Sequence, residues 1–122
     1  MANAINWFEI PASNFERAIS FYQEVLGSEL PRQIIQDSHM AFLPAGEGDV
    51  GGAVVFAEGW EPGPAGSLVY LNGGDDLSTP LDKVEAAGGK VILPKTKISD
   101  EIGYFALFMD TEGNKLAFHS AG

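Results

Sequence analysis

Glu9 is the first residue of the chain whose type and setting suit chemistry in a pocket. It lies in the run INWFEIP, residues 5–11, two positions after Trp7 in a segment that is otherwise mostly apolar. Side chains of a strand alternate between two faces, so a strand here places Trp7 and Glu9 on one side and Phe8 on the other. A partly buried carboxylate acts as a general acid or base, or accepts a hydrogen bond from a ligand. At a wet rim, or paired with Lys115, Glu9 is a plain surface group, and the sequence leaves both interpretations open.

Other reactive side chains are few. The chain has no cysteine, which excludes a disulfide, a thiol nucleophile and a thiolate metal site, and its imidazoles are those of His39 and His119. Two aspartates in GGDD, residues 73–76, would repel phosphate, which favours a helix cap over a phosphate loop. The aromatic residues that could wall a pocket for a planar or cationic ligand, or equally pack in a core, are Trp7, Phe56, Tyr70 and Tyr104.

The first half of the chain predicts one helix among four strands. SNFERAISFYQEVLG, residues 13–27, is typical of a helix that a capping box of Ser13 and Glu16 opens and that Gly27 ends. Its apolar residues recur every three or four positions and form one stripe of Ala18, Ile19, Tyr22, Val25 and Leu26. Strands are predicted at INWFEIP, RQIIQ, HMAFLP and GAVVFAE, with a hairpin turn at the glycine-rich AGEGDVGG.

The second half repeats this order after a stretch rich in proline and glycine, GWEPGPAG, residues 59–66, which we call the linker. A strand at SLVYLNG precedes a helix at LSTPLDKVEAAGG, with Thr79 and Pro80 suited to its start. Three strands follow at KVILPK, GYFALFMD and NKLAFHS. Sliding one helix along the other by 62 residues aligns Gly27 with Gly89 and several apolar positions, which indicates an internal duplication.

The duplication determines the expected fold. Each unit has one helix to cover one face of a sheet, and two units side by side leave the other faces around a shared concavity. We therefore predict an α+β fold in which two tandem βαβββ modules form a cupped eight-stranded mixed sheet with the helices outside. The single domain spans residues 1–122, with module one at 3–58, the linker at 59–66 and module two at 67–120.

Two motifs at matching ends of the duplicated chain point to a known family. The first is the opening strand followed by SNFERAISFY, with LG ending the helix. The second is DTEGNKLAFHS, residues 110–120, in which a D-x-x-G-N turn opens the last strand. Over nearly its whole length the sequence resembles the vicinal oxygen chelate superfamily, which includes glyoxalase-like, bleomycin-resistance-like and extradiol dioxygenase proteins. The resemblance implies a small-molecule site in the cup and a homodimer whose modules pair within or across chains.

Metalloenzyme members of this family place one metal ligand in the first and last strand of each module, all pointing into the cup. In this chain the resemblance puts those positions at Trp7, at Val54 or Phe56, at Val69 or Leu71, and at Ala117. None of these side chains is a usual ligand, so we expect neither the family's metal set nor another cofactor. A divalent ion at a relocated site built on Glu9 and His119 stays open as an alternative, because carboxylate and imidazole suit zinc, manganese or iron.

The predicted function is small-molecule binding, with metal-independent lyase or isomerase activity as an extension of it. Glu9 is the predicted catalytic residue, and the predicted ligand-binding residues are Trp7, Phe56, Tyr70, Lys115 and His119. The alternatives are a metal-dependent lyase, isomerase or dioxygenase with relocated ligands, and a protein that sequesters a cationic antibiotic.

The net charge of −10, from 17 acidic and 7 basic residues, limits the partners. It repels nucleic acid and anionic membrane surfaces, and it attracts cations. No apolar run approaches the roughly 18 residues that a membrane span needs. Met1–Ile5 lacks the basic start and long apolar stretch of a signal peptide. We therefore expect no nucleic acid or membrane partner and a cytoplasmic location.

Overall fold

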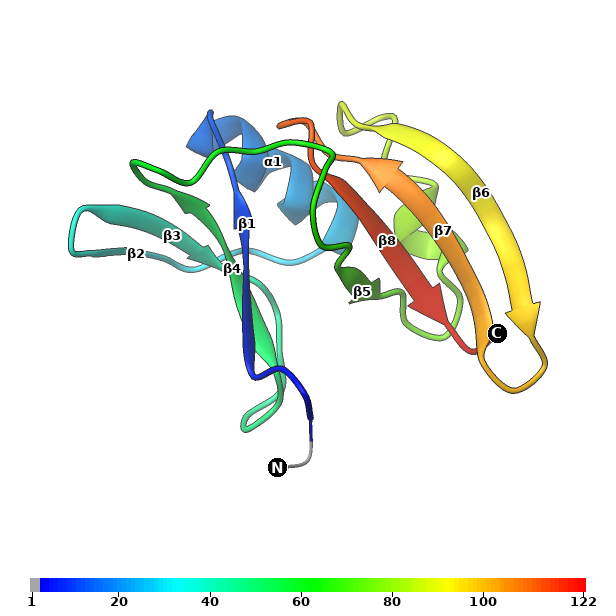
Figure 1. The fold of residues 1–122 in the computed structure, drawn as a ribbon. Helices are drawn as coiled ribbons and strands as arrows, with labels where there is room; N and C mark the ends of the chain where they lie inside the picture. The colour runs from blue at the N-terminus through cyan, green and yellow to red at the C-terminus, as the bar shows by residue number, and fades with distance from the viewer. Residues whose placement is uncertain (1–2) are drawn as a thin grey trace.

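The computed structural model describes residues 3–122, which form two four-stranded mixed sheets side by side (Figure 1). The first module contains β1 (Trp7–Pro11), α1 (Phe15–Leu26), β2 (Arg32–Ile35), β3 (Ser38–Phe42) and β4 (Gly51–Phe56). The second contains β5 (Tyr70–Asn72), α2 (Ser78–Leu81), β6 (Lys90–Ser99), β7 (Gly103–Met109) and β8 (Lys115–Ser120). The strand orders β1-β4-β3-β2 and β5-β8-β7-β6 repeat each other, which confirms an α+β fold of two tandem βαβββ modules.

Each sheet is held together by its own hydrogen bonds. The pairs β1–β4 and β5–β8 are parallel, and the remaining pairs are antiparallel. The eight strands are thus divided between two sheets, and no strand pairing joins the sheets within residues 3–122. Figure 1 shows α1 behind the upper half of β1, reaching toward β8, and the linker running across the top from β4 to β5.

α1 begins one residue later than the capping box predicts. Asn14 is the N-cap, and its side chain accepts a hydrogen bond from the backbone N–H of Arg17. Ser13 instead donates from its backbone N–H and its hydroxyl to Glu112 Oε1, at 2.9 and 3.1 Å. The predicted box of Ser13 and Glu16 is therefore wrong, because a carboxylate from the second module satisfies the donors at this helix start.

The second helix is much shorter than the sequence predicts. Regular α-helix covers only Ser78–Leu81, and tighter turns follow, in which Lys83 and Val84 donate to carbonyls three residues before them. After Leu81, hydrogen bonds of this closer spacing replace most of the α-helical ladder, of which the bond from Ala87 to Lys83 remains. The predicted spacing still holds for packing, because Leu77, Leu81 and Val84 are all buried.

One continuous core joins the two modules. It combines Ile10 and Val54 of the first sheet with residues of α1 and of the second sheet. Phe108 stacks on Phe118 with ring centroids 4.7 Å apart, and Phe21 of α1 lies 6.2 Å from Phe108. We call the opposite side of the first sheet its far face, and a separate small cluster there consists of Met40, Ala53 and Val55.

Within residues 3–122, no helix combines the length and the apolarity needed to cross a bilayer. Met1 and Ala2 belong to the segment that the sequence predicts not to be a signal peptide, and they lie outside the described residues.

Candidate ligand-binding site

Glu9 lies between two indole rings on the far face of the first sheet. Trp7 Nε1 donates to Glu9 Oε2 at 3.2 Å, and Trp60 Nε1, in the linker, donates to Glu9 Oε1 at 2.9 Å. The strand register pairs Trp7 with Gly51 and Glu9 with Ala53, so both side chains lie on the far face. Each carboxylate oxygen has a second lone pair, so Glu9 can also accept a hydrogen bond from a ligand or attract a cation.

Sequence reasoning misses Trp60 as a site residue. The proline and glycine content of residues 59–66 indicates a connection, and Trp60 meets a residue 51 positions away in the chain. The signal that could have found it is the presence of a large aromatic side chain in a stretch of otherwise small or acidic residues. In the structure Trp60 is 45% exposed, so part of its ring is available to a ligand.

Two glycines make room for the rings on the two sides of β1. The Trp7 ring lies over Gly51, where an added Cβ would stand 3.3 Å from Trp7 Cζ3. The Phe8 ring lies over Gly52, where an added Cβ would stand 2.6 Å from Phe8 Cε1. Trp7 also meets Phe42 edge to face, with ring centroids 6.1 Å apart. Trp7 is therefore packed in place although 43% of it is exposed.

An apolar cavity of about 870 Å³ lies between the first sheet and β5. Trp7 and Tyr70 both border it, together with side chains such as Phe8, Leu43 and Leu71. Ligand sites are commonly apolar clefts of about 300–1,000 Å³ with a few polar groups that orient the ligand. The cavity has the size and the lining of such a site, and Trp7 connects it to Glu9 through the indole hydrogen bond.

Two smaller hollows adjoin this cavity and contain the remaining polar candidates. One of about 630 Å³ lies beside Tyr70 and His119, and one of about 220 Å³ contains Glu9 and Lys115. Within residues 3–122 no ion pair joins Glu9 to Lys115. His119 Nε2 lies 2.6 Å from the carbonyl oxygen of Ile102. A carbonyl only accepts, so Nε2 carries the proton, and Nδ1 of the neutral ring is an acceptor.

Phe56 and Tyr104 each lie on the side of their own sheet that faces the core, Phe56 in the first sheet and Tyr104 in the second. Phe56 follows Val54 at the strand period of two, and its ring lies 6.0 Å from that of His39. Tyr104 packs against the core, with Lys95 Nζ 4.6 Å from its ring centroid. Neither ring borders the hollows that contain the other candidates.

The residues at the family's metal-ligand positions do not fit a divalent ion. Trp7 presents an indole that donates its N–H, and Ala117 presents a methyl group paired across the strands with Tyr70. The residues expected at the two central positions, Val54 or Phe56 and Val69 or Leu71, have apolar side chains on the core side of their sheets. Within residues 3–122 no three His, Cys, Asp or Glu side chains are grouped so as to hold a metal.

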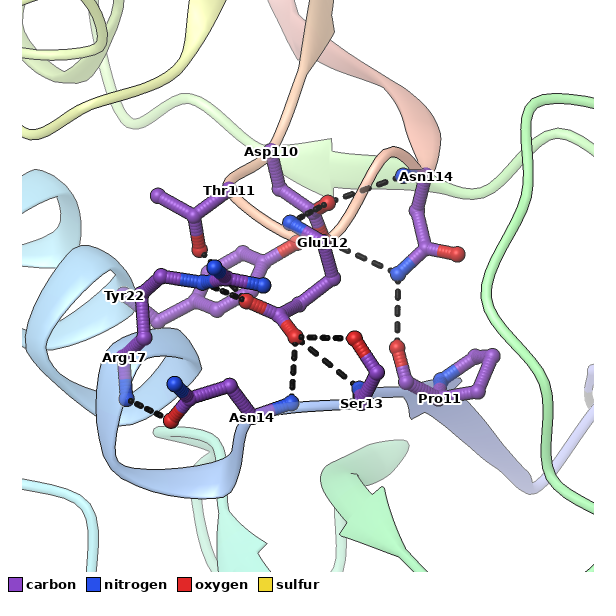
Figure 2. Close-up of polar contacts among 9 residues, drawn as sticks. All are labelled: Pro11, Ser13, Asn14, Arg17, Tyr22, Asp110, Thr111, Glu112 and Asn114. Carbon is purple, nitrogen blue, oxygen red and sulfur yellow. Dashed lines mark hydrogen bonds and ion pairs between the residues drawn. The ribbon is translucent and has the colours of Figure 1, made fainter.

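A buried polar joint fastens α1 to the turn before β8 (Figure 2). Glu112 Oε1 accepts from the backbone N–H groups of Asn14 at 2.7 Å and Ser13 at 2.9 Å. Glu112 Oε2 accepts from Arg17 Nε at 2.7 Å and from Thr111 Oγ1 at 3.0 Å. Burial alone would raise the pKa of Glu112, but the hydrogen bonds from Arg17, Asn14, Thr111 and Ser13 outweigh it and lower the pKa to about 2.

Asp110 and Asn114 extend this joint to β1 and the linker. Asp110 Oδ2 accepts from the hydroxyl of Tyr22 at 2.7 Å and from Asn114 Nδ2 at 3.0 Å. Burial, together with the charge of Asp110, raises the pKa of Tyr22 well above its ordinary 10.0. Asn114 Nδ2 also donates to the carbonyl of Pro11 at 2.7 Å, and Asn114 Oδ1 accepts from the N–H of Gly63 at 2.9 Å. The D-x-x-G-N turn thus contacts both segments that carry the Trp7, Glu9 and Trp60 group.

Several known proteins are similar to this chain in sequence, in fold or in both. A glyoxylase-like domain-containing protein of Didymella fabae is 33% identical over 116 residues, which cover 90% of this chain and 88% of the relative. TnmS3, an antibiotic binding protein from Streptomyces sp. CB03234, is 28% identical, with a TM-score of 0.68 over 100% of this chain and 99% of that chain. A glyoxalase I mutant from Zea mays has the same fold, with 20% identity and a TM-score of 0.73 over 94% of this chain and 45% of that chain.

The family itself follows from the match to a family model described as Glyoxalase/Bleomycin resistance protein/Dioxygenase superfamily, which covers residues 4–118. The match runs from the segment before β1 into β8, so it covers nearly all of both modules, the whole first motif and residues 110–118 of the second. The chain therefore belongs to the glyoxalase/bleomycin resistance protein/dioxygenase superfamily.

Proposed function

We propose that this protein binds a small organic molecule at the Trp7, Glu9 and Trp60 group, without the family's usual metal set. The observation that carries the proposal is the pair of indole hydrogen bonds to Glu9, one of them from Trp7, whose ring also borders the cavity of about 870 Å³. These bonds orient two ring faces and a carboxylate before a ligand arrives, which lowers the entropy cost of binding. The likeness to TnmS3, described as an antibiotic binding protein, supports this reading.

The chemistry of the site favours a ligand with an apolar or aromatic body and a cationic or hydrogen-bond-donating group. The body would occupy the apolar cavity beside Trp7, and the polar group would meet Glu9. An ammonium group there would gain from the carboxylate and from contact with an indole face, which contributes about 0.5–2 kcal/mol. The net charge of −10 adds a longer-range attraction that salt screens. Sequestration of a cationic compound without turnover is the form of binding that these features favour.

Two probes of nearly equal shape test the proposal. Tryptamine is cationic and indole-3-ethanol is neutral, and both can be titrated against the indole N–H signals of Trp7 and Trp60 by NMR. We expect tryptamine to bind more tightly, its affinity to fall with added salt, and Glu9→Gln to remove its advantage. Glu24→Gln, an exposed change on α1, controls for net charge. Indole signals that neither probe shifts would contradict the proposal.

A second candidate is metal-independent lyase or isomerase chemistry with Glu9 as the acid–base group. The observation in its favour is that Glu9 and Lys115 line the same hollow of about 220 Å³, so a carboxylate and an ammonium group border one small space. Mass analysis of a bound compound after long incubation separates the two candidates. A ligand recovered unchanged supports binding alone. A product that disappears in Glu9→Gln, while the ligand still binds, supports catalysis.

A further inference from the structure

Two neighbouring links join β1 to the linker. The first is the hydrogen bond of 2.9 Å from Trp60 Nε1 to Glu9 Oε1. The second passes through Asn114, which donates to the carbonyl of Pro11 at 2.7 Å and accepts from the N–H of Gly63 at 2.9 Å. Glu9 and Pro11 lie two residues apart on β1, and Trp60 and Gly63 lie three apart in the linker. The place where Gly63 is held against β1 therefore limits the distance between the Trp60 ring and Glu9.

The side-chain amide of Asn114 is fully used in its link. Its two N–H groups meet two acceptors, the carbonyl of Pro11 and Asp110 Oδ2, and its oxygen meets one donor, the N–H of Gly63. Only one orientation of the amide satisfies all three. A backbone hydrogen bond of 2.9 Å to Asp110 Oδ1 fixes the residue further, and it is 6% exposed. An aspartate here would set a second carboxylate against Asp110, so the site requires an amide.

Few other hydrogen bonds join the linker to distant segments of residues 3–122. No strand or helix is assigned to residues 59–66, and Gly59 and Gly66 near its ends adopt the left-handed conformation, with φ of 89° and 99°. Among the described residues, the hydrogen bonds that the linker donates to distant segments are those from Trp60 to Glu9 and from Gly63 to Asn114. Each of these two bonds therefore depends on the other for the placement of the linker.

We propose that Asn114 is a positioning residue that fixes the linker against β1 so that Trp60 closes on Glu9. The linker then forms one wall of the ligand site, and Trp60 helps to determine which ligands fit. This inference rests on the proposed function at Glu9. It also means that one turn serves two purposes, since Glu112 fastens the modules and Asn114, two residues later, sets the shape of the site (Figure 2).

The placement of Trp60 can be tested without any ligand, through its indole signal in ¹H–¹⁵N spectra. In Asn114→Ala we expect the Trp60 signal to move to its position in Glu9→Ala and to exchange faster with water. Gly63→Pro removes the linker donor and leaves the buried turn intact, and an added Cβ at Gly63 meets open space. It should move the same signal. Asn14→Ala weakens only the α1 cap and should leave the Trp60 signal unmoved. An unmoved Trp60 signal in Gly63→Pro overturns the proposal, whatever Asn114→Ala shows.

The consequence for binding is tested with tryptamine. Trp60→Ala should weaken binding roughly tenfold, the scale of one well-placed contact between a cation and a ring. Asn114→Ala and Gly63→Pro should each weaken binding by a similar factor, and combining either with Trp60→Ala should cost nothing more, because all three changes remove the same contact. If the losses of binding free energy in the single variants instead add up in the double variants, Asn114 and Trp60 act independently and the proposal is overturned. If tryptamine does not bind the unaltered protein, the proposed function fails, and the indole signals still decide the placement of Trp60.

Discussion

Arg17 Nε lies 2.7 Å from Glu112 Oε2, and this ion pair joins the first helix to the last turn of the second module. Most surface ion pairs contribute about 0–1 kcal/mol to stability. This pair differs, because the Glu112 side chain is 0% exposed and accepts further hydrogen bonds from Ser13, Asn14 and Thr111. The polar joint between the modules is therefore centred on one buried charge, beside the apolar core that they share.

Acid should weaken this joint. The pKa of Glu112 is about 2 in the folded protein, against an ordinary value of 4.5. A carboxyl group with a depressed folded-state pKa stabilises the fold above its ordinary value, and that stability is lost as the pH falls from about 4.5 toward about 2. The difference corresponds to about 3 kcal/mol. Urea unfolding followed from about pH 7 to about pH 3 should show most of this loss in the unaltered protein and a flatter profile in Glu112→Gln. Identical profiles for the two proteins would contradict the prediction.

Removing the cation should also weaken the joint. Arg17→Met keeps most of the aliphatic stem but leaves the buried Glu112 Oε2 without its charged donor, and we expect a clear loss in the free energy of unfolding. Arg32→Met is the matched control, because Arg32 pairs with Glu16 at the surface, where both side chains are exposed. The control should change stability by no more than about 0.5 kcal/mol. Equal losses of unfolding free energy in Arg17→Met and Arg32→Met would show that burial of Glu112 does not strengthen its ion pair.

Gly52→Ala should destabilise the first module. The added methyl would stand 2.6 Å from Phe8 Cε1, so the ring or the strand must shift, at a cost of about 1–3 kcal/mol. Gly63→Ala is the matched control, because a Cβ there meets nothing within 4 Å and the backbone is not left-handed. A glycine replaced at such a site changes stability little or raises it by about 0.4–1 kcal/mol. Thermal unfolding of both variants checks the difference, and a Gly52→Ala protein as stable as the parent would show that Phe8 repacks freely.

We expect the protein to form a homodimer, as the family resemblance implies. Several large apolar side chains remain exposed around the hollows of the second sheet, among them Tyr70, Ile98 and Ile102. Sedimentation analysis should give a dimer for the unaltered chain, and Ile102→Glu should shift the equilibrium toward monomer, because a desolvated carboxylate would be costly in an interface. Glu101→Gln, at the neighbouring exposed position, should leave the association unchanged. A monomer at all concentrations would contradict the prediction.

Sequence reasoning succeeded where the signals are local. The stripe on α1 and its end at Gly27, which adopts φ 67°, follow from spacing and from the conformational freedom of glycine, so they are predictable from neighbouring residues. The start of α1 is not, because the group that binds Ser13 is Glu112, 99 residues away. The role of Trp60 is not predictable either, because its partner Glu9 is also distant in the chain and their contact leaves no pattern in the linker sequence.

The candidate site shows what strand alternation predicts and what residue type alone does not. Alternation within one short strand predicts that Trp7 and Glu9 lie together. The aromatic type of Phe56 does not tell which face of its strand it occupies, and it lies on the same face as the core residue Val54. Phe56 consequently lies beside His39 on the α1 side.

Gly51 and Gly52 favour the observed register of β1 and β4, in which Trp7 pairs with Gly51 and Phe8 pairs with Gly52. A slip of one residue would exchange the two faces of β1, carrying the Trp7 ring toward the core and the Phe8 ring toward the far face. A slip of two would bring Trp7 against Ala53, whose methyl group occupies the space that the ring needs. The two glycines thus leave room for two adjacent rings, that of Trp7 on one face of the sheet and that of Phe8 on the other. The strand alignment that places Trp7 at the ligand site is therefore the same one that packs Phe8 against the core, so a change of alignment would alter both.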